Sequence, residues 1–510
     1  MPEQTTNHTE IAVRTAEPLA LPEPAAIVPK DKPAREDLPI GFNGYLRLLR
    51  IGLSFILFVA RVLFNKRRWL RSKKKTEAEL RHSEGASLRV KLLALGPTFI
   101  KIGQTLATRA DLLPVEYIQE LSKLQDEVPP FANEEAREII TRELKAEIAD
   151  FFKEFETDPI AAASLGQVYR ATLQTGQVVA VKVQRPNIAE KIDLDIRVLR
   201  RIARLLERYP NLIRGVDWQG TLDEFHATIA EEMDYEQEAR NAEMFRKNFV
   251  EWKEVYVPQI YHTFSTRHLI VMEFISGIKV IETDELRAAG HNPHEVVNLL
   301  AKTYLKQLLE DGFFHADPHP GNLRVMQDGR LAFFDFGMVG RLSMELQSKL
   351  INAFFHIVER DVHGLVEDMV RLGFIELSPD EEKRFKPVIE ALFDRYLSLR
   401  IGDVKFKELI FDLAHVIYEF PFRIPANFTY IVRAIMTLEG IGTLVDPSFN
   451  FFEVARPYAK RFMFRREGRY LRQLIVNQLI RGESGNIEWG KVWKLAKMAF
   501  RYYVRGENKF

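Results

Sequence analysis

The pattern of hydrophobic and polar positions changes several times along the chain, and these changes divide it into segments. Residues 1–40 show no apolar periodicity and hold seven prolines among acidic and polar residues. Such a stretch buries too little apolar surface to offset the entropy of ordering, so we predict a disordered leader. Helical periodicity resumes from about residue 80 and runs to Gln125, where Val128-Pro129-Pro130 breaks it. A second helical stretch is predicted over 133–155.

The period then shortens to that of strands. "QVYRATL" alternates, "QTGQ" is typical of a turn and "VVAVKVQ" is a β-branched run, which together predict a β-hairpin. A mostly helical region over 186–250 precedes two short strand candidates, "VYVPQIY" and "HLIVMEF". Helices predominate from 281 onward, except over 317–337, where loop, strand, turn, strand and loop are predicted. The pattern therefore favours a small α+β unit followed by a larger helical one, with a helical extension in front.

Composition narrows the possibilities without identifying a function. A chain of 510 residues, with 46% hydrophobic and 28% charged positions, is long enough for two or three globular domains. The net charge of +1 provides no global field that would favour nucleic acid, so we expect no nucleic-acid partner. The absence of cysteine excludes disulfides and thiolate metal sites.

One segment combines apolar and basic residues in an unusual way. Residues 41–75 contain ten Lys or Arg and no acidic residue; "IGLSFILFVA" is continuously apolar and "NKRRWLRSKKK" follows closely. Ten helical residues rise about 15 Å, roughly half of a bilayer's hydrocarbon core. We therefore expect 41–80 to lie on an anionic membrane surface rather than span it, although a docking helix with a solvated basic end has the same pattern.

Two motifs in the α+β unit suggest a nucleotide site. Val179-Ala180-Val181-Lys182 is typical of the strand that carries the ATP-binding lysine of a kinase. The preceding stretch stands where a glycine-rich phosphate loop is expected, but alanine replaces two of its three glycines. The candidate loop residues are Ala161, Ala162, Ala163, Ser164, Gly166 and Val168. We predict a stiffer phosphate loop with altered nucleotide handling.

Three further motifs follow in a fixed order. Asp234 and Glu238 are four apart on a long predicted helix, so one carboxylate should reach Lys182. His315, Asp317 and Asn322 reproduce the H-x-D-x-x-x-x-N spacing of a kinase catalytic loop, and Asp335-Phe336-Gly337 comes thirteen residues after Asn322.

These residue types suit phosphoryl transfer, which depends mainly on positioning and charge neutralisation. Lys182 would hold nucleotide phosphates, Asn322 and Asp335 would bind Mg²⁺, and Asp317 would orient or deprotonate an acceptor hydroxyl. A metal site made of His315, Asp317 and His319 is the alternative. It leaves the order of the other motifs unexplained.

At these residues the chain resembles the UbiB/AarF/ADCK family of atypical protein-kinase-like proteins, over about residues 85–345. "KIGQ" at 101–104 is similar to the family's K-x-G-Q motif, and "AAASLGQV" to its alanine-rich loop. "EMD" at 232–234 is similar to its E-x-D motif, and Glu238 stands at the position of the lysine's helix partner. The resemblance adds these expected nucleotide-site residues: Lys101, Gln104, Glu232, Asp234, Glu238 and Glu273. From the pattern alone, Lys101 and Gln104 could equally form a solvated stripe.

The resemblance implies a two-lobed kinase fold that binds ATP or ADP with Mg²⁺, with the K-x-G-Q helix folded over the active site. It also implies an ATPase or kinase that supports isoprenoid quinone biosynthesis, together with other quinone-biosynthesis proteins or a quinone precursor, at the inner face of the cell membrane. The expected division is leader 1–40, membrane-contact segment 41–80, extension 81–145, N-lobe 146–275, C-lobe 276–455 and basic helical tail 456–510.

Two other functions fit part of the sequence. A soluble small-molecule phosphotransferase of the aminoglycoside-kinase type shares H-x-D-x-x-x-x-N but needs neither "KIGQ" nor the basic segment 41–80. A nucleotide-sensing membrane scaffold would bind ATP or ADP without turnover. The sequence after Gly337 becomes helical within a few residues and lacks A-P-E, which disfavours docking of a protein substrate.

Overall fold

A computed structural model describes residues 41–72, 76–107, 113–125, 128–207, 218–359 and 426–464, with a few isolated positions between 364 and 391 and at 493. The predicted leader 1–40 and most of the predicted basic tail, from 465 onward, lie outside the described residues.

The helical extension begins with a long helix that packs on its neighbours through one side only. Helix α1 (Gly41–Ser72) is followed by α2 (Glu77–Leu95), α3 (Pro97–Leu106) and α4 (Val115–Ser122). Gly96 separates α2 from α3 because it adopts φ +99°, and Pro97 then starts α3, where its missing N–H costs nothing. Leu92, Phe99, Leu121 and Leu124 form the core of this bundle.

Gly103 allows two elements of this bundle to approach closely. A Cβ at this position would lie 2.3 Å from Leu124 Cδ1 and 2.8 Å from Leu92 Cδ1. The glycine of "KIGQ" therefore lets α3 pack tightly on its neighbours.

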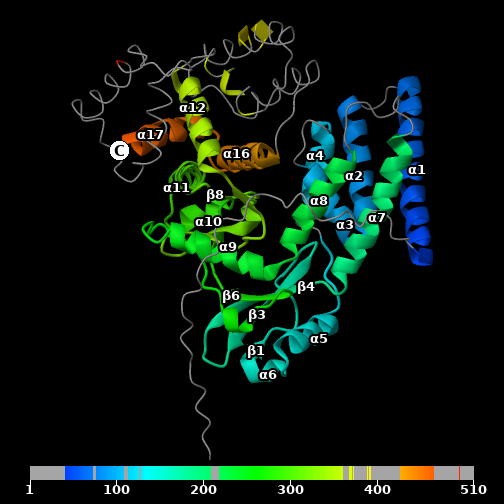
Figure 1. Cartoon of the computed structure of the whole chain (residues 1–510), viewed down its shortest axis with the longest axis horizontal. Helices are drawn as coiled ribbons and strands as arrows, with labels where there is room; N and C mark the ends of the chain where they lie inside the picture. The colour runs from blue at the N-terminus through cyan, green and yellow to red at the C-terminus, as the bar shows by residue number, and fades with distance from the viewer. Residues whose placement is uncertain are drawn as a thin grey trace, which may run out of the picture.

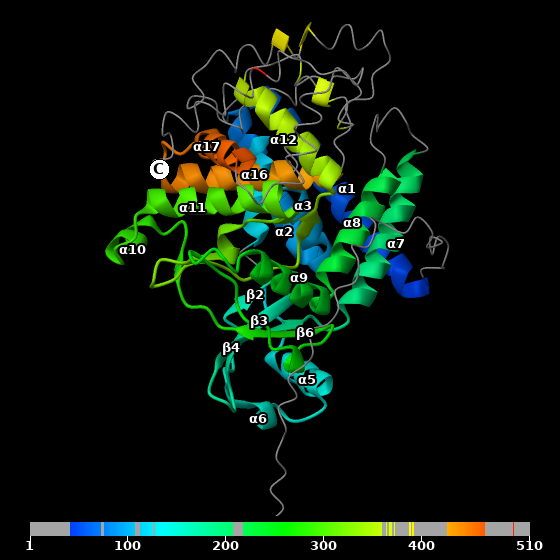
Figure 2. The same cartoon turned by 60° about the vertical axis from the view of Figure 1, so that its left-hand side comes forward.

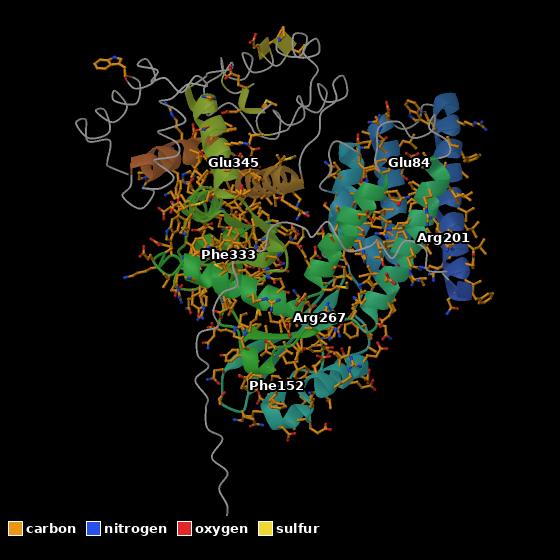
Figure 3. The ribbon with its side chains drawn as sticks, viewed as in Figure 1. Glu84, Phe152, Arg201, Arg267, Phe333 and Glu345 are labelled. Atoms are coloured by element: carbon orange, nitrogen blue, oxygen red, sulfur yellow. The ribbon has the colours of Figure 1, made fainter. Side chains whose placement is uncertain are left out.

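Two helices from later in the chain complete the bundle. Helix α7 (Ile188–Glu207) leaves the predicted N-lobe and packs on α1 and α3, and α8 (Trp218–Glu232) packs on α7 (Figure 1). Arg47 of α1 donates to Asp195 of α7 at 2.6 Å, and Arg201 of α7 lies 5.8 Å from the centroid of the Tyr45 ring (Figure 3). The helical region 186–250 was predicted, but its packing on the extension was not.

The predicted hairpin is confirmed and forms the centre of a five-stranded sheet. Strands β3 (Gly166–Leu173) and β4 (Val178–Gln184) pair antiparallel, flanked by β1 (Phe152–Phe155), β2 (Ala161–Ala162) and β6 (Leu269–Glu273). Helices α5 (Asn133–Leu144) and α6 (Ile148–Phe151) lie beside this sheet (Figure 2). Ile139 and Ile140 of α5 share one buried core with Val179, Val181 and Val271, so α5 belongs to the sheet lobe although the predicted extension 81–145 includes it.

The second lobe is mainly helical. It contains α10 (Thr283–Ala288), α11 (Pro293–Lys306), α12 (Met344–Glu359), α16 (Ala426–Val445) and α17 (Phe451–Phe464). Its strands are β5 (Val255–Tyr256), β7 (Ile278–Lys279), β8 (Phe313–His315), β9 (Leu323–Val325), β10 (Leu331–Phe333) and β11 (Val339–Arg341). They form the sheet β5-β10-β9-β7 and the pair β11-β8, and one apolar core joins them to the helices.

The predicted mixture of helix and sheet, with a helical C-terminal part, is confirmed. Helix α9 (Tyr235–Asn248) packs on β6 and runs between the five-stranded sheet and the helical lobe, so its residues face both (Figure 1). Strand β5 differs from the expected division, because it pairs with β10 of the helical lobe rather than with the sheet of the lobe in which it was predicted.

Helix α1 is longer than its continuous apolar stretch. It presents apolar side chains outward at helical spacing, which are Phe42, Leu46, Leu49, Leu53, Ile56 and Leu63, while Ile51 is fully buried against the bundle. None of the helices in the described ranges combines the length and apolar character needed to cross a membrane.

Candidate active site

A cavity of about 160 Å³ lies where the sheet, the helical lobe and α3 meet. Its lining includes the predicted catalytic and metal-binding residues Lys182, Asp317, Asn322 and Asp335, and Arg433 from α16. The side chains that carry the chemistry around it are Lys101, Gln104, Lys182, Glu232, Tyr235, Asp317, His319, Asn322, Asp335 and Arg433.

Lys182 on β4 is held by a buried carboxylate. Its Nζ lies 2.8 Å from both carboxylate oxygens of Glu238 on α9 and 5.0 Å from the centroid of the Tyr235 ring. Burial alone would lower the pKa of Lys182, but the carboxylates of Asp335 and Glu238 outweigh burial and raise it. Lys182 is therefore a fixed positive charge at the cavity wall, as an anion-binding lysine must be.

Asp335 and Asn322, the predicted Mg²⁺ ligands, line the same cavity as Lys182. Asp335 follows β10, its Oδ2 lies 3.9 Å from Lys182 Nζ, and its Oδ1 accepts from the Gly337 amide at 2.9 Å. Burial would raise the pKa of Asp335, but Lys182 and then His315 outweigh it, so the carboxyl stays ionised. A carboxylate and an amide oxygen facing one cavity, with room left for phosphate oxygens, suit the hard-oxygen preference of Mg²⁺.

The alternative metal site gains no support. His315 Nδ1 accepts from the Asp317 amide and His319 Nδ1 accepts from the Gly321 amide, both at 3.1 Å. Both rings thus shape the loop between β8 and β9. Within the part of the chain that is described, no group of three His, Asp or Glu side chains is placed to hold a metal ion.

Arg433 reaches Asp317 from α16, far along the chain. Its Nη2 lies 3.7 Å from Asp317 Oδ1, and its guanidinium donates two hydrogen bonds, of 2.9 and 3.1 Å, to the Ala316 carbonyl. Burial would raise the pKa of Asp317, but Arg433 and then Lys101 outweigh it, and the pKa is lowered. Arg433 was not among the predicted site residues; the available signal was a basic residue inside the apolar stretch "FTYIVRAIMTL".

Helix α3 contributes Lys101 and Gln104. Lys101 Nζ lies 2.6 Å from Glu232 Oε2 at the end of α8, and Gln104 Nε2 donates to the Leu124 carbonyl at 2.9 Å. Burial raises the pKa of Glu232, and Lys101 opposes that rise. Both α3 side chains line the cavity, so the solvated-stripe interpretation does not describe them.

The alanine-rich loop reaches the cavity through its second half only. Ala163, Ser164 and Gly166 line it together with Leu165, and the Ala163 amide donates to the Gly166 carbonyl at 2.8 Å. A Cβ at Gly166 would lie 2.5 Å from both the Tyr235 hydroxyl and the Val183 carbonyl, which explains the glycine.

Six predicted residues are not among those that line the cavity: Ala161, Ala162, Val168, Asp234, Glu238 and Glu273. Ala161 and Ala162 form β2, where they pair with Val168 and Gln167 of β3, and Val168 pairs on its other side with Lys182. Glu273 ends β6 and accepts hydrogen bonds of 2.8 Å from the Tyr256 hydroxyl.

The predicted position of Asp234 on one helix with Glu238 is wrong. Asp234 does not share a helix face with Glu238, because α8 ends at Glu232 and Asp234 is the N-cap of α9. Its side chain accepts from the Gln237 amide at 3.0 Å, which satisfies one free donor of the first helical turn. Its carboxylate therefore fixes the start of the helix that carries Glu238, and it is not among the cavity-lining residues.

Comparison with known proteins decides the family. The model described as "ABC1 atypical kinase-like domain" matches residues 123–369, and "UbiB helical domain" matches 389–450. The Synechocystis protein sll1770 is 41% identical over 408 residues, which are 79% of this chain and 70% of that protein. This chain belongs to the ABC1 atypical kinase-like family.

Plant relatives carry the family name. Arabidopsis thaliana "Protein ACTIVITY OF BC1 COMPLEX KINASE 7, chloroplastic" is 39% identical to this chain over 415 residues. Its relative "Protein ACTIVITY OF BC1 COMPLEX KINASE 3, chloroplastic" is 40% identical over 405 residues. This chain covers 59% and 56% of their respective lengths. The resemblance to an ABC1/UbiB-type kinase-like protein stated from the motifs is thus confirmed, and with it the kinase-like domain.

Proposed function

We propose that this protein binds ATP or ADP with Mg²⁺ in the cavity and hydrolyses ATP or passes its γ-phosphoryl group to a small acceptor. The observation behind this proposal is that Lys182, Asn322, Asp335 and Asp317 line one cavity, and that Glu238 holds the Lys182 ammonium. Residues separated by up to about 150 positions in the sequence meet there in the roles that phosphoryl transfer requires.

Each residue has a defined task in this proposal. Lys182 neutralises nucleotide phosphates, and Glu238 keeps its ammonium in place. Asn322 and Asp335 would hold Mg²⁺, which neutralises developing charge on the phosphate oxygens when bound. Asp317 orients an acceptor hydroxyl or water, since its lowered pKa keeps it ionised.

The acceptor is small in this proposal. Lys101, Gln104 and Thr105 of α3 cover the side of the cavity near Asp317, and Arg433 covers another. Only six residues separate Gly337 from the start of α12 at Met344, so no long segment is present there to bind a peptide. Water or a small lipid precursor fits this surrounding better than a protein side chain on a folded substrate.

We further propose that α1 rests on an anionic membrane surface. Its outward residues Phe42, Leu46, Leu49, Leu53 and Ile56 follow helical spacing on one side. Lys66 and Arg67 are exposed further along α1 and lie in the basic run "NKRRWLRSKKK". An apolar stripe with a basic end suits the headgroup region of an anionic bilayer. We propose that the protein acts in isoprenoid quinone or membrane lipid metabolism. It would then work at the inner face of the cell membrane, beside quinone-biosynthesis proteins and near its acceptor.

A hydrolysis assay tests the enzymatic part. We expect wild-type protein to release phosphate from ATP in the presence of Mg²⁺, faster with anionic vesicles or a phenolic lipid, and Asp335→Asn to be inactive. Equal hydrolysis by Asp335→Asn would exclude this cavity as the catalytic site. Tight nucleotide binding without turnover under any lipid condition would favour the nucleotide-sensing scaffold instead.

A vesicle co-sedimentation assay tests the membrane part. Wild type should sediment with phosphatidylglycerol vesicles and remain in solution with phosphatidylcholine vesicles. Replacing Leu49, Leu53 and Ile56 by Gln should abolish sedimentation, whereas the same change at the exposed Leu205 of α7 should have no effect. Undiminished sedimentation of the triple variant would remove α1 from the contact and favour a soluble phosphotransferase or another attachment surface.

A further inference from the structure

Arg185 is a half-buried arginine that neither the catalytic motifs nor the family match accounts for. It directly follows β4, three positions after Lys182. Its Nε and Nη2 donate to the Ala163 carbonyl at 3.2 and 3.1 Å, and Nη2 also donates to the Pro129 carbonyl at 2.5 Å. Its backbone amide donates to the Leu165 carbonyl at 2.8 Å. One residue therefore binds two carbonyls of the alanine-rich loop.

The bond to Ala163 sets the direction of a neighbouring amide. A trans peptide unit is planar, and its carbonyl and its N–H point in opposite directions. Because Arg185 holds the Ala163 carbonyl on its own side of the loop, the Ser164 N–H points to the other side. Ala163, Ser164 and Leu165 all line the cavity. In the described structure the amides of Ser164 and Leu165 donate to no protein acceptor.

A second polar group at this spot also lacks a partner. The Tyr235 side chain is 1% exposed and lines the cavity beside Gly166, and its buried hydroxyl has no hydrogen-bond partner among the described residues. Free amides and an unpartnered hydroxyl near Lys182 form a set of donors for an anion. Buried donors of this kind are costly unless a ligand or water satisfies them.

Arg185 also ties the loop to the segment that leads from the helical extension. Its guanidinium donates to the Pro129 carbonyl and also lies 5.4 Å from the centroid of the Phe131 ring. Gln167 of β3 accepts from the Phe131 amide at 3.1 Å and donates to its carbonyl at 3.4 Å. The loop is thus fixed from outside the cavity, which compensates for the alanines where other phosphate loops have flexible glycines.

We infer that Arg185 is a positioning residue for the nucleotide phosphates, because it turns the Ala163 carbonyl away and presents the Ser164 amide to the cavity. This inference rests on the proposed nucleotide site. The group that it positions is a backbone donor for a phosphate oxygen of ATP or ADP. Arg185 itself touches no phosphate.

Equilibrium binding of Mg-ADP and Mg-ATP to the full chain tests this role, with wild type, Arg185→Gln, Arg185→Lys and the control Arg246→Gln. Arg246 lies exposed on α9 and pairs with Glu243. We expect Arg185→Gln to bind both nucleotides about tenfold more weakly, the effect of losing one hydrogen bond to a charged group. Arg185→Lys should recover part of the affinity by donating to one carbonyl, and Arg246→Gln should match wild type.

Circular dichroism and the thermal midpoint, measured on the same samples, separate positioning from folding. The KM for ATP should rise in Arg185→Gln while kcat falls less. Folded Arg185→Gln that binds nucleotide as wild type does would overturn the inference and leave the proposed function intact. A wild-type chain that binds no nucleotide would instead overturn the proposed function. If Arg185→Gln unfolds the chain, Arg185→Lys takes its place in the test. The affinity of folded Arg185→Lys for nucleotide must then lie below that of wild type.

Discussion

Lys101 of α3 and Glu232 of α8 form an ion pair of 2.6 Å at the cavity wall, although 131 positions separate them in the sequence. This pair joins the helical extension to the residues that precede α9 and places a carboxylate beside the expected phosphates. Glu232 is buried, and burial raises its pKa above the ordinary value of a glutamate. Its charge should therefore affect nucleotide affinity in a pH-dependent way.

Glu232→Gln should tighten nucleotide binding, since it removes a negative charge that repels phosphate. Above the raised pKa of Glu232, where the wild-type carboxylate is ionised, we expect about fivefold higher affinity for Mg-ADP. As the pH falls through the raised pKa of Glu232, the wild-type side chain becomes neutral and its affinity should approach that of the variant. Calorimetric titrations between pH 5 and 8 measure this difference. A constant ratio of affinities over that range would contradict the assignment.

Removing Lys182 should destabilise the fold as well as the site. Lys182→Met leaves the Glu238 carboxylate, 1% exposed, without its ammonium partner. Breaking a buried pair costs about 3–5 kcal/mol in the free energy of unfolding. The double variant Lys182→Met/Glu238→Leu should recover part of that loss, since no unpaired charge remains buried. Urea unfolding monitored by tryptophan fluorescence compares wild type, Lys182→Met, Glu238→Leu and the double variant. Additive losses would show that the two side chains do not act as a pair.

Gly103→Ala tests the close packing of α3. The new methyl group would overlap Leu124 and Leu92, so we expect a loss of about 1–3 kcal/mol and displacement of Lys101 from Glu232. Gly52→Ala in α1 is the matched control, because a Cβ there meets nothing within 4 Å and should stabilise the helix slightly. Thermal midpoints should fall for the first variant and hold or rise for the second. The same response from both would refute the packing argument.

Arg433→Gln should change the pH dependence of catalysis. Arg433 is the largest charge that opposes the burial of Asp317, so removing it raises the pKa of Asp317. A carboxylate that must be ionised then becomes protonated at higher pH, and the acid limb of kcat/KM should move upward. Arg433→Lys keeps the charge and should keep the limb closer to its wild-type position. An unmoved acid limb in Arg433→Gln would mean that Asp317 does not govern the profile.

Local patterns were sufficient for the parts of the site that lie within single elements. The β-branched run gave β4 and therefore placed Lys182 in a strand, and "GNLRVMQDGRLAFFDFG" gave β9, its turn and β10 before Asp335. The fixed spacing of the motifs was enough to predict that these residues share one site, because short loops leave few ways to connect such strands.

Tertiary contacts between distant segments were not accessible from one sequence. Arg433 reaches Ala316 across 117 positions, and Arg185 reaches Pro129 across 56. Neither contact produces periodicity or a motif. The helix break before Asp234 was also missed, because "EEMDYEQEAR" is rich in strong helix formers on both sides of Asp234, which the structure uses as a cap. The packing of α7 and α8 on the extension likewise depends on contacts such as Arg47 with Asp195, which separate segments supply.

The most direct test of the central claim is the Mg²⁺ dependence of nucleotide binding. Calorimetric titration of ADP into wild type and Asp335→Asn, with Mg²⁺ and with EDTA, isolates the contribution of the metal ligand. Asp328→Asn, in the exposed turn between β9 and β10, is the control for loss of an aspartate. We predict that Mg²⁺ strengthens binding to wild type and to Asp328→Asn but not to Asp335→Asn. Binding that is equally strong and equally Mg²⁺-dependent in all three proteins would contradict the account.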